Sequence, residues 1–292
     1  MHRYRKNNGF RKRFLGEEKK VSKFYFTIIT TCYNRADTLV DTMESVFNQT
    51  FKDFEYIVMD ANSTDGTIEL LRDYSEKFEG KMKYYSGPDK GMYDAINKAI
   101  SCAEGKYISI LNSDDYYSHT TLEKVYRCSK NSEKPMIVYG DIMRVTKDKI
   151  PIYRHYFSYS RIENKIPFGH PSMFVPKIVY DKEGTYDLRY FAADAYFQEK
   201  LYQNRDLYEW YISNEIFTFM REGGASDDKK NRKRRLNEIV DIDVRFRNKN
   251  YLISKVKAYL GDYARRVKGK LPYKIQKKLY CMYRQEQINE KI

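Results

Sequence analysis

Two adjacent carboxylates, Asp114 and Asp115, come shortly after an apolar run at residues 107–111. The run has the composition of a buried strand, and ligands in open α/β sheets bind where such strands end. Paired aspartates there form a hard oxygen site that suits Mg²⁺ or Mn²⁺, and these metals commonly hold phosphates. Asn112 and Ser113 are also typical turn residues. The stretch alone therefore leaves a metal site and a plain turn both open.

Polar groups also follow three earlier segments that have the composition of strands. These segments are residues 24–33, 54–59 and 83–86. Apolar residues between them recur at helical spacing, so strands and helices alternate. This alternation predicts a doubly wound α/β fold with a mostly parallel sheet. Parallel strands end at the same edge, so Asn34, Asp60 and Lys90 should lie near the paired aspartates.

The second half of the chain is less regular. Its strand candidates are residues 136–139, 169–175 and 207–220, and its helix candidates lie near 122–126 and 191–201. Asp194 stands near the start of the last of these helices, where a carboxylate is often only a cap. The residues alone therefore leave Asp194 between a structural role and a chemical one.

The net charge of +14 is concentrated at the two ends of the chain. Residues 1–23 carry a balance of +7 and residues 229–292 carry +14, whereas residues 24–228 carry −7. This distribution argues against nucleic acid as a partner and favours contact of the ends with an anionic membrane surface. Residues 229–292 also show helical apolar spacing. We therefore expect a basic flexible lead-in at 1–23, an α/β domain at 24–228 and a basic amphipathic helical tail at 229–292.

Targeting signals and cysteines favour a cytoplasmic setting. No apolar run reaches the roughly 18 residues that a membrane span needs. The first residues lack the apolar core of a signal peptide, and the four cysteines show no CxxC spacing. We expect a cytoplasmic protein whose tail makes it peripheral on the inner face of the cell membrane.

Four motifs in order resemble glycosyltransferase family 2, whose members have the GT-A fold. The motifs are residues 27–35, 57–67, 89–98 and 111–115. The resemblance covers about residues 24–226 and is closest to bacterial members that build surface polysaccharides. It implies an enzyme that takes a sugar from a nucleotide-diphospho sugar, uses Mn²⁺ or Mg²⁺ and inverts the anomeric carbon. It also implies that the domain at 24–228 is a GT-A domain.

The resemblance assigns the donor side of the site. The first loop of the family packs against the nucleotide, and the aspartate after the second strand accepts a hydrogen bond from the base. A uracil N–H would suit that aspartate, which is Asp60 in this chain. The nucleotide-sugar set implied in this way is Thr30, Tyr33, Asn34, Asp60, Asp89, Lys90, Asp94 and Asp114.

The resemblance also assigns the metal, the base and the acceptor side. Asp114 and Asp115 match the Asp-X-Asp element, with Asp115 as the metal ligand and Asp114 nearer the ribose or sugar. A strict Asp-X-Asp would begin at Ser113, so only two carboxylates remain. Asp194 matches the catalytic base and His170 a histidine on the acceptor side. Asp187 is the nearest competitor of Asp194, but it stands in a turn signature.

These residue types fit sugar transfer. The leaving diphosphate must be neutralised, and a carboxylate must take the proton of the acceptor hydroxyl. We predict an inverting glycosyltransferase that moves a sugar from a UDP-sugar to a glycan or lipid-linked acceptor in capsule, exopolysaccharide or lipopolysaccharide assembly. A sugar-phosphate nucleotidyltransferase and a non-catalytic, membrane-associated nucleotide-sugar-binding module remain as alternatives. Hydrolysis is disfavoured only by the motif set.

Overall fold

The computed structural model describes residues 22–163, 169–224, 229–269 and 275. The predicted lead-in at 1–23 therefore lies almost entirely outside the described residues. The described chain divides into two compact units. Unit 1 holds residues up to 142 together with 156–219, and unit 2 holds 143–155 together with the residues from 220 onward. The helical part that the sequence predicts from residue 229 thus shares its unit with a short hairpin segment.

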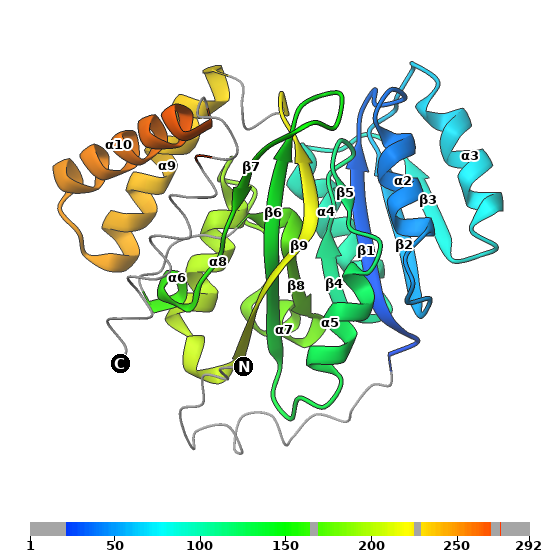
Figure 1. Ribbon diagram of the computed structural model, residues 1–292, viewed down its shortest axis with the longest axis horizontal. Coiled ribbons are helices and arrows are strands. Elements are labelled where there is room, and N and C mark those ends of the chain that lie inside the picture. Colours follow the sequence, from blue (N-terminus) through cyan, green and yellow to red (C-terminus); the bar gives the residue numbers. More distant parts are fainter. Residues whose placement is uncertain (1–21, 164–168, 225–228, 270–274, 276–292) are drawn as a thin grey trace. The chain divides into compact units, whose positions relative to one another are not determined.

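Unit 1 is a twisted sheet with helices on its faces (Figure 1). Its strands are β1 (Phe24–Cys32), β2 (Phe54–Asp60), β3 (Met82–Ser86), β4 (Gly105–Ile110), β5 (Tyr116–Tyr117), β8 (Met173–Pro176) and most of β6 (Met136–Val145) and β9 (Glu209–Arg221). Its helices are α2 (Leu39–Phe47), α3 (Thr67–Lys77), α4 (Met92–Cys102), α5 (Thr121–Ser129), α6 (Tyr159–Glu163), α7 (Lys177–Glu183) and α8 (Ala193–Gln203), with single 3-10 turns η1 (His170–Ser172) and η2 (Arg205–Leu207).

The strand order is β3-β2-β1-β4-β8-β6-β9-β5, and β7 (Pro151–His155) pairs with β6. The first four strands of this order are mutually parallel. β8 runs antiparallel to both β4 and β6, and β9 runs antiparallel to β5. The predicted α/β fold with a mostly parallel sheet is confirmed. Crossover helices that return each parallel strand to the same edge explain why this half of the chain alternates so regularly.

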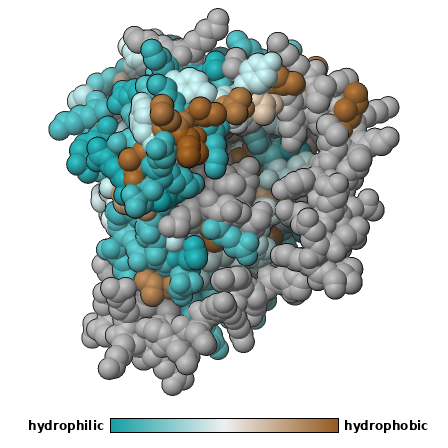
Figure 2. Space-filling model, turned by 90° about the vertical axis from the view of Figure 1, so that its left-hand side faces the viewer, coloured by the Kyte–Doolittle hydropathy of each residue, from teal (hydrophilic) through white to brown (hydrophobic). Residues whose placement is uncertain are grey.

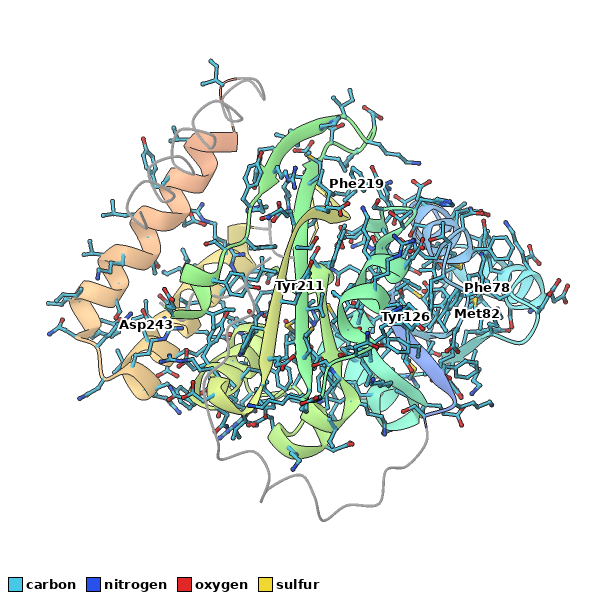
Figure 3. All side chains as sticks on the ribbon, turned by 60° about the horizontal axis from the view of Figure 1, so that its bottom comes forward. Phe78, Met82, Tyr126, Tyr211, Phe219 and Asp243 are labelled. Atoms are coloured by element: carbon cyan, nitrogen blue, oxygen red, sulfur yellow. The ribbon has the colours of Figure 1, made fainter. Side chains whose placement is uncertain are left out.

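The core lies between the sheet and its helices because β1, β2 and β4 are apolar almost throughout. Phe26 and Tyr56 are fully buried, and Phe78 and Met82 close the core beside α3 and β3, where Figure 3 labels them. Gly105, the first residue of β4, lies very close to β1. A Cβ at this position would meet the backbone nitrogen of Thr27 at 2.4 Å. A side chain at that position would push β4 away from β1, so glycine permits the close pairing that aligns the two strand ends.

Unit 2 contains the end of β6, β7, the end of β9 and two long helices. These helices are α9 (Lys229–Arg247) and α10 (Tyr251–Gly269), and they pack against each other as a hairpin. Along the described ranges, no helix is both long enough and apolar enough to cross a membrane.

Candidate active site

The carboxyl ends of four parallel strands form one polar edge of the sheet. The register of β1 and β2 sets Cys32 beside Asp60, and that of β2 and β3 sets Asp60 beside Ser86. β4 pairs with the other side of β1 and ends at Ile110, just before the paired aspartates. The predicted convergence of the strand ends is therefore confirmed. The residues that follow the four parallel strands lie along one edge of the sheet.

Asp60 is held tightly inside this edge. Its carboxylate is 3% exposed and accepts hydrogen bonds from the Ser63 backbone N–H at 3.0 Å and the Ser86 hydroxyl at 2.7 Å. The Ser63 hydroxyl donates to the other oxygen, and the Cys32 thiol approaches it at 3.6 Å. Burial beside this carboxylate raises the pKa of Cys32 far above its ordinary value, so Cys32 stays a neutral donor. A nucleobase N–H would have to replace one of the serine hydroxyls, both of which can rotate.

The loop after β1 presents an aromatic ring to solvent. Asn34 adopts a left-handed conformation with φ of 49°, in which its backbone N–H donates to the Ser63 hydroxyl at 2.8 Å. Its side-chain Oδ1 accepts from the Thr64 N–H at 2.9 Å. These two bonds tie the loop to the segment after β2 and leave the neighbouring Tyr33 ring 60% exposed. An exposed, well-anchored ring is suited to stack on a nucleobase.

Thr30 lies inside the sheet, next to the strand ends. It is completely buried, its hydroxyl donates to the Leu111 carbonyl at 2.8 Å, and it accepts the Tyr56 hydroxyl at 2.9 Å. The hydroxyl therefore joins three neighbouring strands and their loops from inside the sheet. Thr30 thus supports the strand end from inside the sheet, and its predicted contact with a nucleotide stays a prediction.

The third motif shapes a loop and a helix start. Asp89 accepts the Gly91 N–H at 2.7 Å, and Asp94 accepts the Lys90 N–H at 3.0 Å. Asp94 also pairs with Lys98 at 2.8 Å, and this ammonium holds the pKa of the Asp94 carboxyl below its ordinary value. Asp94 is thus bonded to the helix and to the loop before it, and its place in the nucleotide-sugar set stays a prediction. Lys90 is exposed at the same loop.

The paired aspartates point in different directions. Asp115 is 1% exposed, its Oδ2 accepts from the Asn112 amide at 2.9 Å, and its backbone carbonyl accepts the Thr42 hydroxyl at 2.7 Å. Asp114 is partly exposed. Asp114 is therefore the more accessible of the two carboxylates for an ion that is shared with a diphosphate, and the metal roles of both aspartates stay a prediction.

A metal at this edge would need oxygen ligands from the substrate. Within the parts of the chain that the structure describes, no group of three or more His, Cys, Asp or Glu side chains is arranged to hold an ion. Mg²⁺ and Mn²⁺ are usually held in such enzymes by one or two carboxylates together with substrate phosphates. A single partly exposed aspartate at a strand end fits that mode of binding.

Asp194 lies in the first turn of α8 and is oriented by Tyr93 from α4. The Tyr93 hydroxyl donates to Asp194 Oδ1 at 3.0 Å and accepts the Asp194 backbone N–H at 3.4 Å. Asp194 as a whole is only partly buried. One tyrosine therefore fixes both the backbone and the side chain of the predicted base.

His170 lies close to Asp194, inside an aromatic cluster. Its Nε2 is 2.7 Å from the Tyr186 hydroxyl, which is 3.1 Å from the Tyr180 hydroxyl, and its ring lies 6.4 Å from that of Tyr93. Burial lowers the pKa of His170, and the negative charge of Asp194 opposes this effect only in part. The imidazole is therefore neutral at pH 7. The structure brings His170 and Asp194 together, although 24 positions separate them in the sequence.

Asp187, the competitor of Asp194, is occupied elsewhere. Its Oδ2 pairs with Arg189 Nη2 at 2.6 Å, and its Oδ1 accepts the Arg189 Nε–H at 3.0 Å. This guanidinium holds the pKa of the Asp187 carboxyl below its ordinary value. A carboxylate bound on both oxygens by arginine is a poor proton acceptor, so the geometry favours Asp194.

Sequence reasoning missed Tyr93, Asn97 and Tyr186. The Asn97 side chain makes two hydrogen bonds to the Tyr186 backbone. Its Nδ2 donates to the Tyr186 carbonyl at 2.7 Å, and its Oδ1 accepts the Tyr186 N–H at 3.0 Å. Tyr93 and Asn97 both lie in the motif at residues 89–98, for which the resemblance implies only donor contacts. Their spacing of four residues places them on one helix face, and that signal could have indicated a second contact surface for α4.

We expect Tyr93→Phe to lower kcat about tenfold and to leave the KM for the donor unchanged, because a hydrogen bond to a charged group contributes about 1.5–3 kcal/mol. The substitution removes the donor to Asp194 and keeps the ring that contacts Tyr186. Steady-state kinetics at saturating donor would measure the effect.

Tyr74→Phe is the matched control for this experiment. The Tyr74 hydroxyl also donates to a carboxylate, Glu44 Oε1, at 2.6 Å, on the helices α2 and α3. The control should keep its kcat. A Tyr93→Phe enzyme with wild-type kcat, or with KM raised by the same factor as kcat falls, would contradict the orienting role.

Comparison with protein families identifies the chain. The model of the family described as Glycosyl transferase family 2 matches residues 27–197, which include the strand ends and Asp194. The chain belongs to glycosyltransferase family 2. This glycosyltransferase is also similar to curated relatives. It is 30% identical over 205 residues to a "PGL/p-HBAD biosynthesis glycosyltransferase" of Mycobacterium bovis, an alignment that spans 69% of this chain and 79% of the relative.

A shorter alignment covers about a third of the enzyme's length. Over 98 residues it is 38% identical to the "Putative teichuronic acid biosynthesis glycosyltransferase TuaG" of Bacillus subtilis, which covers 34% of this chain and 39% of that one.

Solved structures share the fold of this family 2 enzyme. TarS 1–349 of S. aureus in complex with UDP-GlcNAc superposes with a TM-score of 0.60 at 18% identity, covering 79% of this chain and 69% of that one. The mannosyltransferase PcManGT of Pyrobaculum calidifontis in complex with GDP-Man and Mn²⁺ gives 0.59 at 17% identity, covering 85% and 73%. These matches confirm the predicted GT-A architecture.

Proposed function

We propose that this glycosyltransferase moves a sugar from a UDP-sugar to an acceptor hydroxyl by a single, inverting displacement. The observation that carries the proposal is the Asp194 carboxylate, partly exposed, oriented by Tyr93 and adjacent to the neutral His170. One carboxylate on the acceptor side is what an inverting transfer requires.

The donor would bind along the polar edge of unit 1. The exposed ring of Tyr33 would stack on the base, and Asp60 would accept a uracil N–H in place of a serine hydroxyl. Asp89 and Lys90 lie at the loop before α4, where the exposed ammonium of Lys90 would pair with a phosphate. Support for a nucleotide-sugar donor also comes from the fold neighbours, which were solved with UDP-GlcNAc and with GDP-Man.

Asp114 would hold the Mn²⁺ or Mg²⁺ ion together with diphosphate oxygens of the donor. When bound, such an ion neutralises the charge that develops on the leaving diphosphate. Asp115 would support Asp114 from inside through its bond to Asn112. In this proposal Asp114 is the principal metal ligand and Asp115 the supporting residue, whereas the resemblance implies Asp115 as the ligand.

In the proposed reaction, the protein's own side chains accept the proton of the acceptor hydroxyl. The acceptor oxygen forms a bond to the anomeric carbon as the bond from that carbon to the diphosphate oxygen breaks. The proton of the acceptor hydroxyl passes to the free oxygen of Asp194, while Tyr93 holds the other oxygen. His170, neutral and held by Tyr186, would offer a hydrogen bond to the acceptor without adding charge. UDP leaves with the electron pair of the broken bond.

We place the reaction in the assembly of a bacterial surface polysaccharide, on a glycan or lipid-linked acceptor. The names of the relatives, which refer to PGL/p-HBAD and teichuronic acid biosynthesis, support this class of acceptor. Capsule, exopolysaccharide and lipopolysaccharide assembly are the settings we propose. The enzyme would work in the cytoplasm and, through its basic tail, peripherally on the inner face of the membrane.

A panel of nucleotide sugars would test this function directly. With Mn²⁺ present, UDP release should exceed the rate without enzyme for at least one UDP-sugar and should increase when the matching acceptor is added. Release of pyrophosphate from a sugar phosphate and a nucleoside triphosphate, with formation of a nucleotide-diphospho sugar, would instead identify a nucleotidyltransferase. Donor binding without any turnover across the panel would identify a non-catalytic binding module.

A further inference from the structure

One face of α10 exposes an apolar stripe to solvent. Leu252 is 69% exposed, Leu260 62% and Tyr263 60%. With about 3.6 residues per turn, they fall on one side of the helix. The full stripe consists of Leu252, Ile253, Val256, Tyr259, Leu260, Tyr263 and Val267. Figure 2 shows exposed apolar residues gathered in a band that hydrophilic residues border.

The opposite face of α10 is polar and packs against α9. Ser254 and Asp262 are both buried there. Asp262 Oδ2 lies 2.7 Å from Arg232 Nη2, and Asp262 Oδ1 lies 3.7 Å from Arg235 Nη2. This is the reverse of a water-soluble helical hairpin, in which the apolar faces meet. Rotating α10 to bury its stripe would leave the charge of Asp262 and those of two arginines without their partners, which is strongly unfavourable.

Lysines border the stripe on both sides. By helical geometry Lys255 lies along one edge and Lys257 along the other, and both are exposed. An apolar stripe between two cationic edges matches the boundary of an anionic bilayer, where acyl chains lie beneath phosphate groups. If two copies of the chain paired through this face, the lysines of one copy would lie near those of the other. Repulsion between these like charges disfavours such a dimer.

We propose that α10 lies in the plane of an anionic membrane with the stripe from Leu252 to Val267 inserted among the acyl chains and Lys255 and Lys257 at the phosphates. This inference deepens the membrane location proposed above: it names an inserted apolar surface where the tail's charge alone would give only electrostatic contact. α9 then acts as the support that keeps the stripe turned outward. The helix is an interfacial one, since it does not qualify as a membrane span.

The test is vesicle co-sedimentation of the full chain, with phosphatidylcholine vesicles that contain or lack phosphatidylglycerol. The wild-type chain should pellet with the anionic vesicles. Leu252→Glu with Leu260→Glu should lower the partition coefficient at least about tenfold, because each substitution removes an inserted side chain and adds a repelled charge. Leu188→Glu with Ile150→Glu is the matched control, since both residues are exposed apolar side chains outside α10. The control should bind as the wild type does.

A second variant reports insertion itself. The single native tryptophan, Trp210, is buried, so a tryptophan introduced as Leu260→Trp gives a separate emission signal. Its emission should shift to the blue on anionic vesicles. Equal pelleting of the glutamate variant and the wild type, no shift, or a dimer in solution that the glutamate variant dissociates would each overturn the proposal.

The outcome is independent of the chemistry. Far-ultraviolet circular dichroism of the same proteins reports their helical content and verifies that the glutamate variant is folded, without reference to the proposed reaction. Loss of vesicle binding with the helical content retained would support the membrane surface. UDP release from donors without vesicles would support the transfer reaction even if the membrane surface failed.

Discussion

Replacing Asp194 with asparagine should lower sugar transfer by about 10²–10⁴-fold, the usual contribution of a general base. The amide keeps the shape of the side chain and can still accept the Tyr93 hydroxyl, which now lies 3.0 Å from Oδ1. It cannot accept the proton of the acceptor hydroxyl. The fall should therefore appear in kcat, with the KM for the donor unchanged, because Asp194 acts on the acceptor side.

Asp187→Asn is the matched control for Asp194→Asn. Both substitutions convert an aspartate to asparagine within the same region of unit 1, but Asp187 is paired with Arg189 at the surface. The control should keep its kcat within about twofold, since surface ion pairs contribute about 0–1 kcal/mol. Full activity of Asp194→Asn, or inactivity of Asp187→Asn, would transfer the role of the base away from Asp194.

The strand ends could be predicted from the sequence because two independent patterns agree there. Apolar runs of β-branched and aromatic residues mark buried strands, and each run ends in a polar turn. The parallel topology then places the backbones of Asn34, Asp60 and Asp114 at one edge of the sheet, independently of the direction in which their side chains point. The backbone position of a site is thus largely a consequence of topology, which sequence periodicity reveals.

Side-chain directions were not predictable in the same way. Thr30 and Asp115 turn inward, where they bond to the Leu111 carbonyl and the Asn112 amide. Neighbouring residues in extended chain point to opposite sides, but a turn after a strand interrupts that alternation. Adjacent aspartates therefore give no indication of which one faces solvent.

The acceptor side was the least predictable part because contacts distant in sequence build it. The segment at 169–175 has the composition of a strand, yet His170–Ser172 forms a 3-10 turn before β8 begins at Met173. Pro171 lacks a backbone N–H and interrupts the ladder at that point. The partners of His170 and Asp194 are Tyr186 and Tyr93, which come from two other segments, and no local pattern encodes such a cluster.

Exchanging Asp114 for asparagine should weaken metal-dependent binding of UDP, and the same exchange at Asp115 should not. In the proposed site the ion is held by the Asp114 carboxylate and the diphosphate, so loss of the negative oxygen removes the only protein charge on the ion. The Kd for UDP with Mn²⁺ should rise at least about tenfold, equivalent to about 1.4 kcal/mol. Isothermal titration calorimetry with Mn²⁺ and with a chelator would separate the metal-dependent part.

Asp115→Asn is expected to affect stability and not metal binding. Its Oδ2 accepts from the Asn112 amide in a site that is 1% exposed. An amide nitrogen there would face another donor, and an unsatisfied buried group costs about 1–3 kcal/mol in the free energy of unfolding. Denaturant unfolding would measure this loss. If Asp115→Asn removes the metal-dependent binding and Asp114→Asn retains it, the roles are reversed, and the carboxylate of Asp115 must turn outward when the donor binds.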